Sequence, residues 1–296
     1  MTFTLSSAAL AAPVRRLVAG VAAPILAFAA PLPAAATPLP APIVHGEAFF
    51  NLGTAPRTID VFGTLVHSAP THGTLVFSST GTPSPALTAT ASLDPVGTGS
   101  GTVSGFLRYT FEILGDDCLG AEGCVPVFAF AAGRVAGYAD PGPFNGFESI
   151  ARWSLRNTSE IILVGDSLHI SGSGGDSDVQ GFAETHSLML RTNTEYRVVM
   201  EVLARAGGLE AGALSVAEAF IDPLFSFGAG VDPGRYAFHF ADGVGNSPPV
   251  AGVPAPGGLA LVMVGLLAMA VRRSRLNDGW DVRAGAPAST SGACQG

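Results

Sequence analysis

The sequence predicts an all-β fold, an antiparallel β-sandwich of jelly-roll-like form, and three observations favour it. Gly (38) and Pro (22) are too frequent for long helices through the middle of the chain. Short runs that alternate apolar and polar residues, as half-buried strands do, recur between residues 43 and 242. Turn residues separate the runs, and about 200 residues can bury one continuous core. The clearest runs are Thr58–Val66, Gly73–Ser78, Val103–Ile113, Ser149–Leu155, Ser187–Arg191, Glu195–Val202, Leu214–Phe220 and Arg235–Phe240.

One of these runs also fits a helix. Between residues 195 and 206, Val198, Val199, Val202 and Leu203 fall at helical spacing. Because β-branched residues dominate the segment, we predict a strand there.

The charged residues of the chain exclude two classes of function, nucleic-acid binding and lysine-based catalysis. The net charge is −8 and there is no Lys. Residues 37–256 hold 9 Arg against 21 Asp and Glu, a net charge of −12. Such a domain is unsuited to nucleic acid, because neutralising phosphates needs a basic surface. The absence of Lys also excludes lysine-based catalysis.

The N-terminal segment has the pattern of a secretory signal peptide. Arg15 and Arg16 precede the short apolar stretch 17–30, and small residues follow. Ala34 and Ala36 satisfy the A-x-A cleavage pattern. We therefore predict a signal peptide over residues 1–36, removed by signal peptidase. A first transmembrane helix is the alternative, but the run is short and interrupted by proline.

The C-terminal part predicts one short transmembrane helix. Residues 257–271 carry no charge, and at about 1.5 Å per residue they reach only about 22 Å of a hydrocarbon core about 30 Å thick. Arg272, Arg273 and Arg275 follow at once, and the positive-inside rule keeps them cytoplasmic. We assign 257–275 to the helix and its arginine cluster. The polar tail 276–296 has a disordered composition.

Pro-rich or small-residue linkers flank the predicted β-sandwich domain, at 37–42 and 243–256. The second linker contains Val253, Pro254, Ala255 and Pro256, directly before the apolar span and the arginine cluster. This three-part tail resembles the PEP-CTERM sorting signal of Gram-negative bacteria, with Ala255 in place of the usual Glu. The upstream stretches Ala219–Phe225, Tyr236–Phe240 and Asp242–Pro248 also look like the last strands and "GNSP" linker of many such proteins.

The resemblance implies recognition by an exosortase, a membrane transpeptidase. Cleavage is then expected near residues 254–256, with transfer of the domain from the inner membrane to the cell exterior. The chain departs from the family in continuing for some twenty residues beyond Arg275, from Leu276 to Gly296.

Cys118 and Cys124 flank a short hairpin-like loop in the exported part, where thiols are usually oxidised. We predict a disulfide between them, contributing about 2 kcal/mol on the chain-entropy model. Cys294 lies beyond the membrane span, so it cannot pair with either.

Ile161–Leu168 resembles the nucleophile block of GDSL esterases, with Ser167 as the candidate nucleophile. Such an enzyme needs an Asp-x-x-His element near its C-terminus and a Gly-x-Asn-Asp element. Here the Asp-x-x-His runs from Asp166 to His169 inside the same block, and the second element is absent. We therefore predict a two-strand hairpin with Gly165-Asp166 at its turn.

The remaining candidate sites are weak. Two acidic pairs, Asp116-Asp117 and Asp176-Ser-Asp178, offer oxygen ligands for Ca²⁺ but fall short of the six a site needs. Asn157-Thr-Ser159 matches a glycosylation sequon. No two histidines have the spacing of a helical zinc site. The histidines are His45, His67, His72, His169, His186 and His239.

We therefore expect no enzyme, cofactor or metal. The sequence favours an exported structural or adhesive protein of the cell envelope or exopolysaccharide matrix. The alternatives are an extracellular module that binds carbohydrate or Ca²⁺, and a secreted GDSL-like hydrolase.

Overall fold

A computed structural model describes residues 38–51, 54–93, 99–116, 124–208 and 213–247. They form thirteen β-strands in two antiparallel sheets, and no helix occurs in these ranges. The predicted antiparallel β-sandwich is therefore confirmed for this part of the chain. The predicted signal peptide, transmembrane helix and tail lie outside the described residues.

The first sheet, sheet A, has the strand order β2-β1-β6-β11-β8-β9, with β13 paired to the end of β6. Sheet B has the order β10-β7-β12-β5-β4-β3. The strands of sheet A are β1 (Ile43–Phe50), β2 (Arg57–Ile59), β6 (Gly99–Gly115), β8 (Gly146–Arg156), β9 (Ile162–Ser173), β11 (Tyr196–Gly208) and β13 (Tyr236–Phe240). Those of sheet B are β3 (Gly63–Ala69), β4 (Gly73–Thr80), β5 (Ala86–Leu93), β7 (Val125–Ala139), β10 (Ser177–Leu190) and β12 (Ser215–Phe227).

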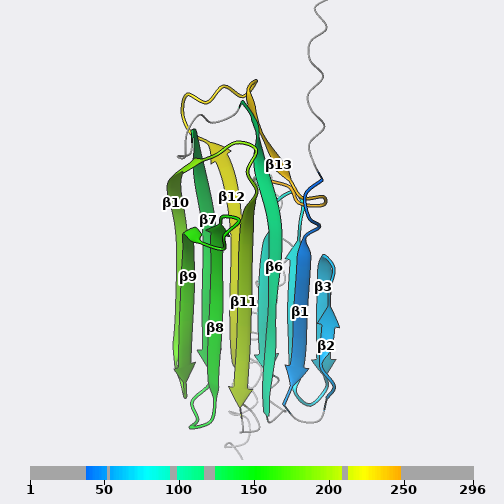
Figure 1. The fold of residues 1–296 in the computed structure, drawn as a ribbon. Helices are drawn as coiled ribbons and strands as arrows, with labels where there is room; N and C mark the ends of the chain where they lie inside the picture. Colours follow the sequence, from blue (N-terminus) through cyan, green and yellow to red (C-terminus); the bar gives the residue numbers. More distant parts are fainter. Residues whose placement is uncertain (1–37, 52–53, 94–98, 117–123, 209–212, 248–296) are drawn as a thin grey trace, which may run out of the picture. The chain divides into compact units, whose positions relative to one another are not determined.

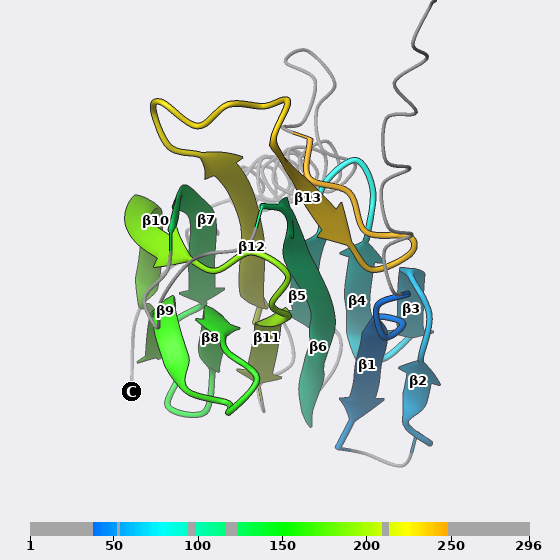
Figure 2. The same ribbon diagram turned by 45° about the horizontal axis from the view of Figure 1, so that its top comes forward.

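The two sheets pack face to face with their strands matched in order (Figures 1 and 2). β11 lies over β12, β8 over β7 and β6 over β5. Eight strands pair in a nested way: β8 with β9, β7 with β10, β6 with β11, and β5 with β12. This nesting, split between two sheets, is the connectivity of a jelly roll, and β1–β4 and β13 extend it.

Strict alternation builds the core. β12 shows it most clearly, since its residues from Ser215 to Phe225 are buried at every second position. The inward side chains of sheet A are large, such as Phe111, Trp153 and Met200, whereas sheet B contributes many alanines. Bulky residues on one sheet therefore fill the space left by small residues on the other, as close packing requires.

At some positions glycine is required, because an aromatic ring packs directly against the backbone and leaves no room for a Cβ. A Cβ on Gly105 would come within 2.2 Å of the Phe77 ring, and one on Gly46 would come equally close. At the other end of the sandwich, a Cβ on Gly137 would be 1.9 Å from Phe147. The high Gly content thus includes positions that a larger residue cannot occupy.

The strand predictions hold with two differences. Of the segment 195–206, residues 196–206 lie within β11, so the helical alternative is excluded. The run Thr58–Val66 is divided, because the chain bends at residues 61–62 between β2 and β3. The predicted hairpin at Gly165-Asp166 is wrong, since both residues lie inside the continuous strand β9 and pair with β8. β9 instead forms a hairpin with β8. The later turn at Gly174 and Gly175, which both have positive φ, carries the chain from β9 in sheet A to β10 in sheet B.

Candidate functional site

The last described segment, residues 243–247, is held against the sandwich by hydrogen bonds; we call it the C-terminal clasp. Gly245 N–H donates to Gly81 O at 2.7 Å, and Ser247 N–H donates to Pro83 O at 2.9 Å. Asn246 bonds Phe225 twice, accepting from its N–H at 2.8 Å and donating to its C=O at 2.6 Å. β12 pairs with β5 only as far as Ile221, so Asn246 satisfies strand groups that no neighbouring strand reaches.

The residue types of the clasp follow from this close approach. A Cβ on Gly245 would lie 2.3 Å from Pro83 O, and one on Gly81 would lie 2.1 Å from Gly243 O. Gly243 itself has a φ of 81°, which favours glycine. Val244 between them is buried and packs on the core. The segment, placed in a linker by its composition, is thus packed onto the domain.

A buried carboxyl lies next to the clasp. Asp222 Oδ2 accepts a long hydrogen bond of 3.5 Å from Ser84 Oγ, and its Oδ1 is buried without a partner. Burial raises the pKa of Asp222 from 3.8 to about 6, against a smaller lowering by Ser84. Tyr109 in the core also has a hydroxyl without a partner, and its pKa is raised well above its usual range, first by burial and second by the charge of Asp222.

A second polar cluster joins the two sheets at their shared edge. His186 Nε2 of β10 lies 2.9 Å from Asp166 Oδ2 of β9, and the same oxygen accepts from Trp153 Nε1–H at 2.9 Å. Sequence reasoning did not connect Asp166 with His186. The turn at Gly174-Gly175 carries the chain from β9 to β10, which lie at the same side of the two sheets. β9 pairs with β8 and β10 with β7, so no spacing in the sequence marks Asp166 and His186 as neighbours.

Ser167 does not belong to this cluster. Side chains alternate along a strand, so Ser167 is exposed on the outer face of sheet A while Asp166 points toward His186. His169 shares the outer face, where its Nε2 contacts Glu148 Oε1 at 3.3 Å. The geometry therefore separates the candidate nucleophile of the hydrolase hypothesis from the Asp–His pair.

The outer face of sheet A is rich in charge. It carries five of the nine arginines of residues 37–256, namely Arg108, Arg152, Arg156, Arg197 and Arg205. Arg152 pairs with Glu201, while Arg156 and Arg197 both contact Glu160. A shallow groove of about 450 Å³ runs over these residues beside Ser167. Because these pairs are exposed, they add little stability.

The outer face of sheet B is different. One half, on β3, β4 and β5, is rich in Ser and Thr side chains. Their hydroxyls form cross-strand hydrogen bonds between Thr64 and Ser78 and between Ser68 and Thr74, both at 3.2 Å. The other half exposes apolar side chains on β7 and β10. The largest are Phe128 (37 % exposed), Phe130 (36 %), Val179 (62 %) and Met189 (58 %).

Most of the predicted site residues lie outside the described residues. This holds for Ala34 and Ala36, for Val253, Pro254, Ala255 and Pro256, for Arg272, Arg273 and Arg275, for residues 257–271 and for Cys118. Cys124 precedes β7, where its N–H donates to Leu190 O at 3.0 Å, and its predicted pairing with Cys118 stays a prediction. Within the described ranges, no helix has the length and hydropathy to cross a membrane.

The calcium and sequon candidates occupy turns. Asp176 accepts from Ser173 N–H in the β9–β10 turn, and Asp116 forms an ion pair with Arg235. Asn157 accepts from the N–H groups of Ser159 and Ile161 in the β8–β9 turn. Over the residues that the structure describes, no three His, Cys, Asp or Glu side chains gather as metal ligands would.

Comparison with known proteins gives no family. No family model matches the chain, and no curated protein matches it. Among solved structures, the enzymatically active domain of tailspike protein 4 of bacteriophage CBA120 is 11 % identical over 62 % of this chain, with a TM-score of 0.17. This chain spans 19 % of that tailspike chain. A structure of infectious bursal disease virus strain Gx is 12 % identical over 84 % of this chain and 70 % of that chain, with a TM-score of 0.22. At such TM-scores the likenesses support no inference about function.

Proposed function

We propose that this chain is an exported β-sandwich protein with a structural or adhesive role at the cell surface, sorted there by an exosortase. The observation that carries the proposal is the C-terminal clasp. It anchors Asn246 and Ser247 on the sandwich, and the sorting element at Val253 follows after residues 248–252. In the sequence, the proposed processing site therefore follows the last described residue, Ser247, by six positions.

The stretches that resemble the family form one structural unit, which supports the proposal. β12 contributes Phe225, β13 adds a strand to sheet A, and the clasp closes over the end of β12. A tether attached after Ser247 would therefore pull on the hydrogen bonds that join the clasp to the β4–β5 connection and to Phe225 of β12. That arrangement suits a domain displayed from its C-terminus.

The test is the intact mass of the protein recovered from a host that has an exosortase. We expect a species that starts at Thr37, ends near residues 254–256 and lies outside the cell. As a matched control, Pro254→Ala combined with Pro256→Ala should leave signal-peptide removal intact and block the second cleavage. A wild-type protein that keeps its C-terminus and stays in the inner membrane would contradict sorting and leave a simple membrane anchor.

An extracellular carbohydrate-binding module is a second candidate, favoured by the aromatic pair on β7. Phe128 and Phe130 lie two residues apart on one face, so their rings are neighbours on a flat surface. Hydroxyl residues pair with them on the adjacent strands, Thr185 and Ser187 of β10 and Ser226 of β12. Exposed rings next to hydroxyls suit a sugar ring, which has apolar faces and polar edges.

Sedimentation with the host's exopolysaccharide distinguishes this candidate. If it is correct, the double variant Phe128→Ala, Phe130→Ala should lose binding that Phe144→Ala retains. Phe144 is the control because it is also an exposed phenylalanine, at 62 %, but lies away from the aromatic pair in the loop between β7 and β8. Equal binding by the wild type, the double variant and Phe144→Ala would show that the aromatic pair is not the binding site.

A further inference from the structure

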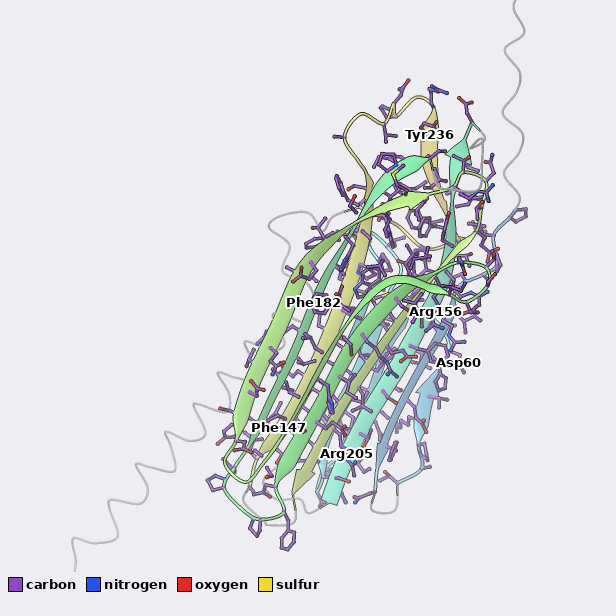
Figure 3. All side chains as sticks on the ribbon, turned by 60° about the vertical axis from the view of Figure 1, so that its left-hand side comes forward. Asp60, Phe147, Arg156, Phe182, Arg205 and Tyr236 are labelled. Carbon is purple, nitrogen blue, oxygen red and sulfur yellow. The ribbon has the colours of Figure 1, made fainter. Side chains whose placement is uncertain are left out.

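One side of the sandwich ends in two open edge strands. β9 closes sheet A and β10 closes sheet B, and the pair Asp166–His186 joins them (Figure 1). β10 has 14 residues, whereas β2 at the opposite edge of sheet A has three. Figure 3 turns this side forward, with Phe182 of β10 labelled.

β10 lacks several devices that protect edge strands from pairing. The segment Ser177–Leu190 contains no Pro, Lys or Arg, and its ladder with β7 runs without a register shift. The exposed side chains of Val179 and Met189 stand on its outer face. A strand of this length with free backbone groups is a template for another strand.

The backbone of β10 shows which groups are free. Ala139 N–H donates to Asp176 O at the start of the β7–β10 ladder, so even-numbered residues of β10 turn their N–H and C=O toward β7. Odd-numbered residues therefore turn theirs toward the open edge. Ala183, Thr185 and Ser187 stand at the middle of this free row, and all three side chains are exposed.

We propose that two copies of this chain pair antiparallel through β10, with Thr185 of one copy opposite Thr185 of the other. The pairing doubles the six-stranded sheet B across a two-fold axis. It stands on the edge alone and does not depend on the proposed sorting or surface role.

The sequence of β10 is self-complementary in this register. Glu184 of each copy meets His186 of the other, which Asp166 already holds in place from behind. Phe182 meets Leu188 on the same face. On the outer face the exposed Met189 lies over Gly181, where the other copy has no side chain. Matched polar pairs and apolar pairs across strands each stabilise a sheet.

Neighbouring registers lose these matches. Centring the pair on Glu184 sets that carboxylate against its own copy, and like charges directly opposite are destabilising. Centring it on Ala183 sets Glu184 against Phe182 and Asp178 against Leu188. Centring it on His186 sets Glu184 against Leu188. Of these four registers, the one centred on Thr185 is therefore the one that sets Glu184 against His186 and also pairs the apolar residues.

Disulfide cross-linking of the full chain tests the register. Directly opposed residues in such a pair have Cα atoms about 5.5 Å apart, within disulfide range. Thr185→Cys should link to itself. Ala183→Cys and Ser187→Cys should each fail to link alone, because each residue lies about 13 Å from its own copy. An equal mixture of the two should link, since position 183 opposes position 187.

The unsubstituted chain, oxidised in parallel, controls for Cys118, Cys124 and Cys294. A second measurement is sedimentation of the full chain. Ala183→Pro removes one N–H at the open edge while leaving the bonds to β7, so it should convert a dimer to a monomer with an unchanged circular dichroism spectrum. Failure of Thr185→Cys to link, or linking of Ala183→Cys alone as readily as in the mixture, would overturn the proposal. So would a wild-type chain that sediments as a monomer.

Discussion

Asp222→Asn is expected to stabilise the protein at neutral pH and to leave it unchanged in acid. The carboxyl is mostly buried beside the clasp, with Oδ1 unpartnered and one long hydrogen bond from Ser84 Oγ. Its pKa is raised from 3.8 to about 6, chiefly by burial. At about 1.4 kcal/mol per pH unit, the shift of about two units corresponds to about 3 kcal/mol.

The sign follows from proton binding. The folded chain holds the Asp222 proton more tightly than the unfolded chain, so the folded state is favoured below about pH 4. This advantage is lost as the pH rises through 6, where the folded protein must carry a buried charge. The Asn variant keeps a similar shape without that charge. Its gain over wild type should therefore grow from about 0.5 kcal/mol at pH 4 to about 3 kcal/mol at pH 7.5.

Urea unfolding followed by Trp fluorescence measures the difference, because Trp153 is buried in the core. Taking the difference between two proteins at each pH cancels the titration of other groups, including Glu218, whose pKa is also raised by burial. Asp242→Asn is the matched control, since it makes the same change at an exposed side chain near the clasp. A gain that is the same at pH 4 and pH 7.5, or that Asp242→Asn reproduces, would refute the assignment of a costly charge to Asp222.

Three further predictions concern the clasp, the core and the cysteines. Asn246→Ala should lower the free energy of unfolding by about 2 kcal/mol, because Phe225 loses both bonds, and amide exchange at Phe225 should accelerate; unchanged exchange would argue against the clasp. Gly105→Ala should cost about 1–3 kcal/mol in chemical denaturation, since its Cβ would meet the Phe77 ring and His45 O, whereas Gly207→Ala, with its nearest neighbour 3.8 Å away, should cost less. In secreted protein, alkylation before reduction should spare Cys118 and Cys124, and labelling of both would exclude the predicted disulfide.

The strands were predictable where one face is buried and the other is not. β8 and β12 alternate clearly in sequence, and β11 was separated from a helix by its β-branched residues. β7 was missed because its run from Val125 to Ala139 is apolar on both faces, with Val and Ala inside and Phe128 and Phe130 outside, so no polar period marks it. β9 was misinterpreted because Gly165-Asp166 has the composition of a turn. Glycine is needed at position 165 because a Cβ there would meet Trp153 O of β8. That reason cannot be found in the sequence before the strands are paired.

The polar clusters were less predictable, because they depend on which strands meet. Asp166 and His186 meet because β9 and β10 are edge strands at the same side of the two sheets, and the wrong turn at Gly165-Asp166 hid that arrangement. Asp222 and Ser84 are 138 positions apart and meet through the end of sheet B. Nothing in their local sequences marks them as neighbours. The Gly, Asn and Ser pattern at residues 243–247 was noticed through a family resemblance, and its physical reason appeared only with the bonds to Gly81, Pro83 and Phe225.

The clasp also decides where the folded domain ends. If the chain were released after Asp242, Phe225 would lose its partners for N–H and C=O, and Val244 would leave the core. Both changes cost free energy, because a buried backbone group without a partner is expensive and an apolar side chain is exposed. The folded domain therefore extends to Ser247, and a force applied to the chain beyond that residue would act on the bonds of the clasp to Phe225, Gly81 and Pro83. Gly81 and Gly245, which let the two backbones come this close, are as necessary for holding the clasp on the domain as Asn246, which forms the bonds.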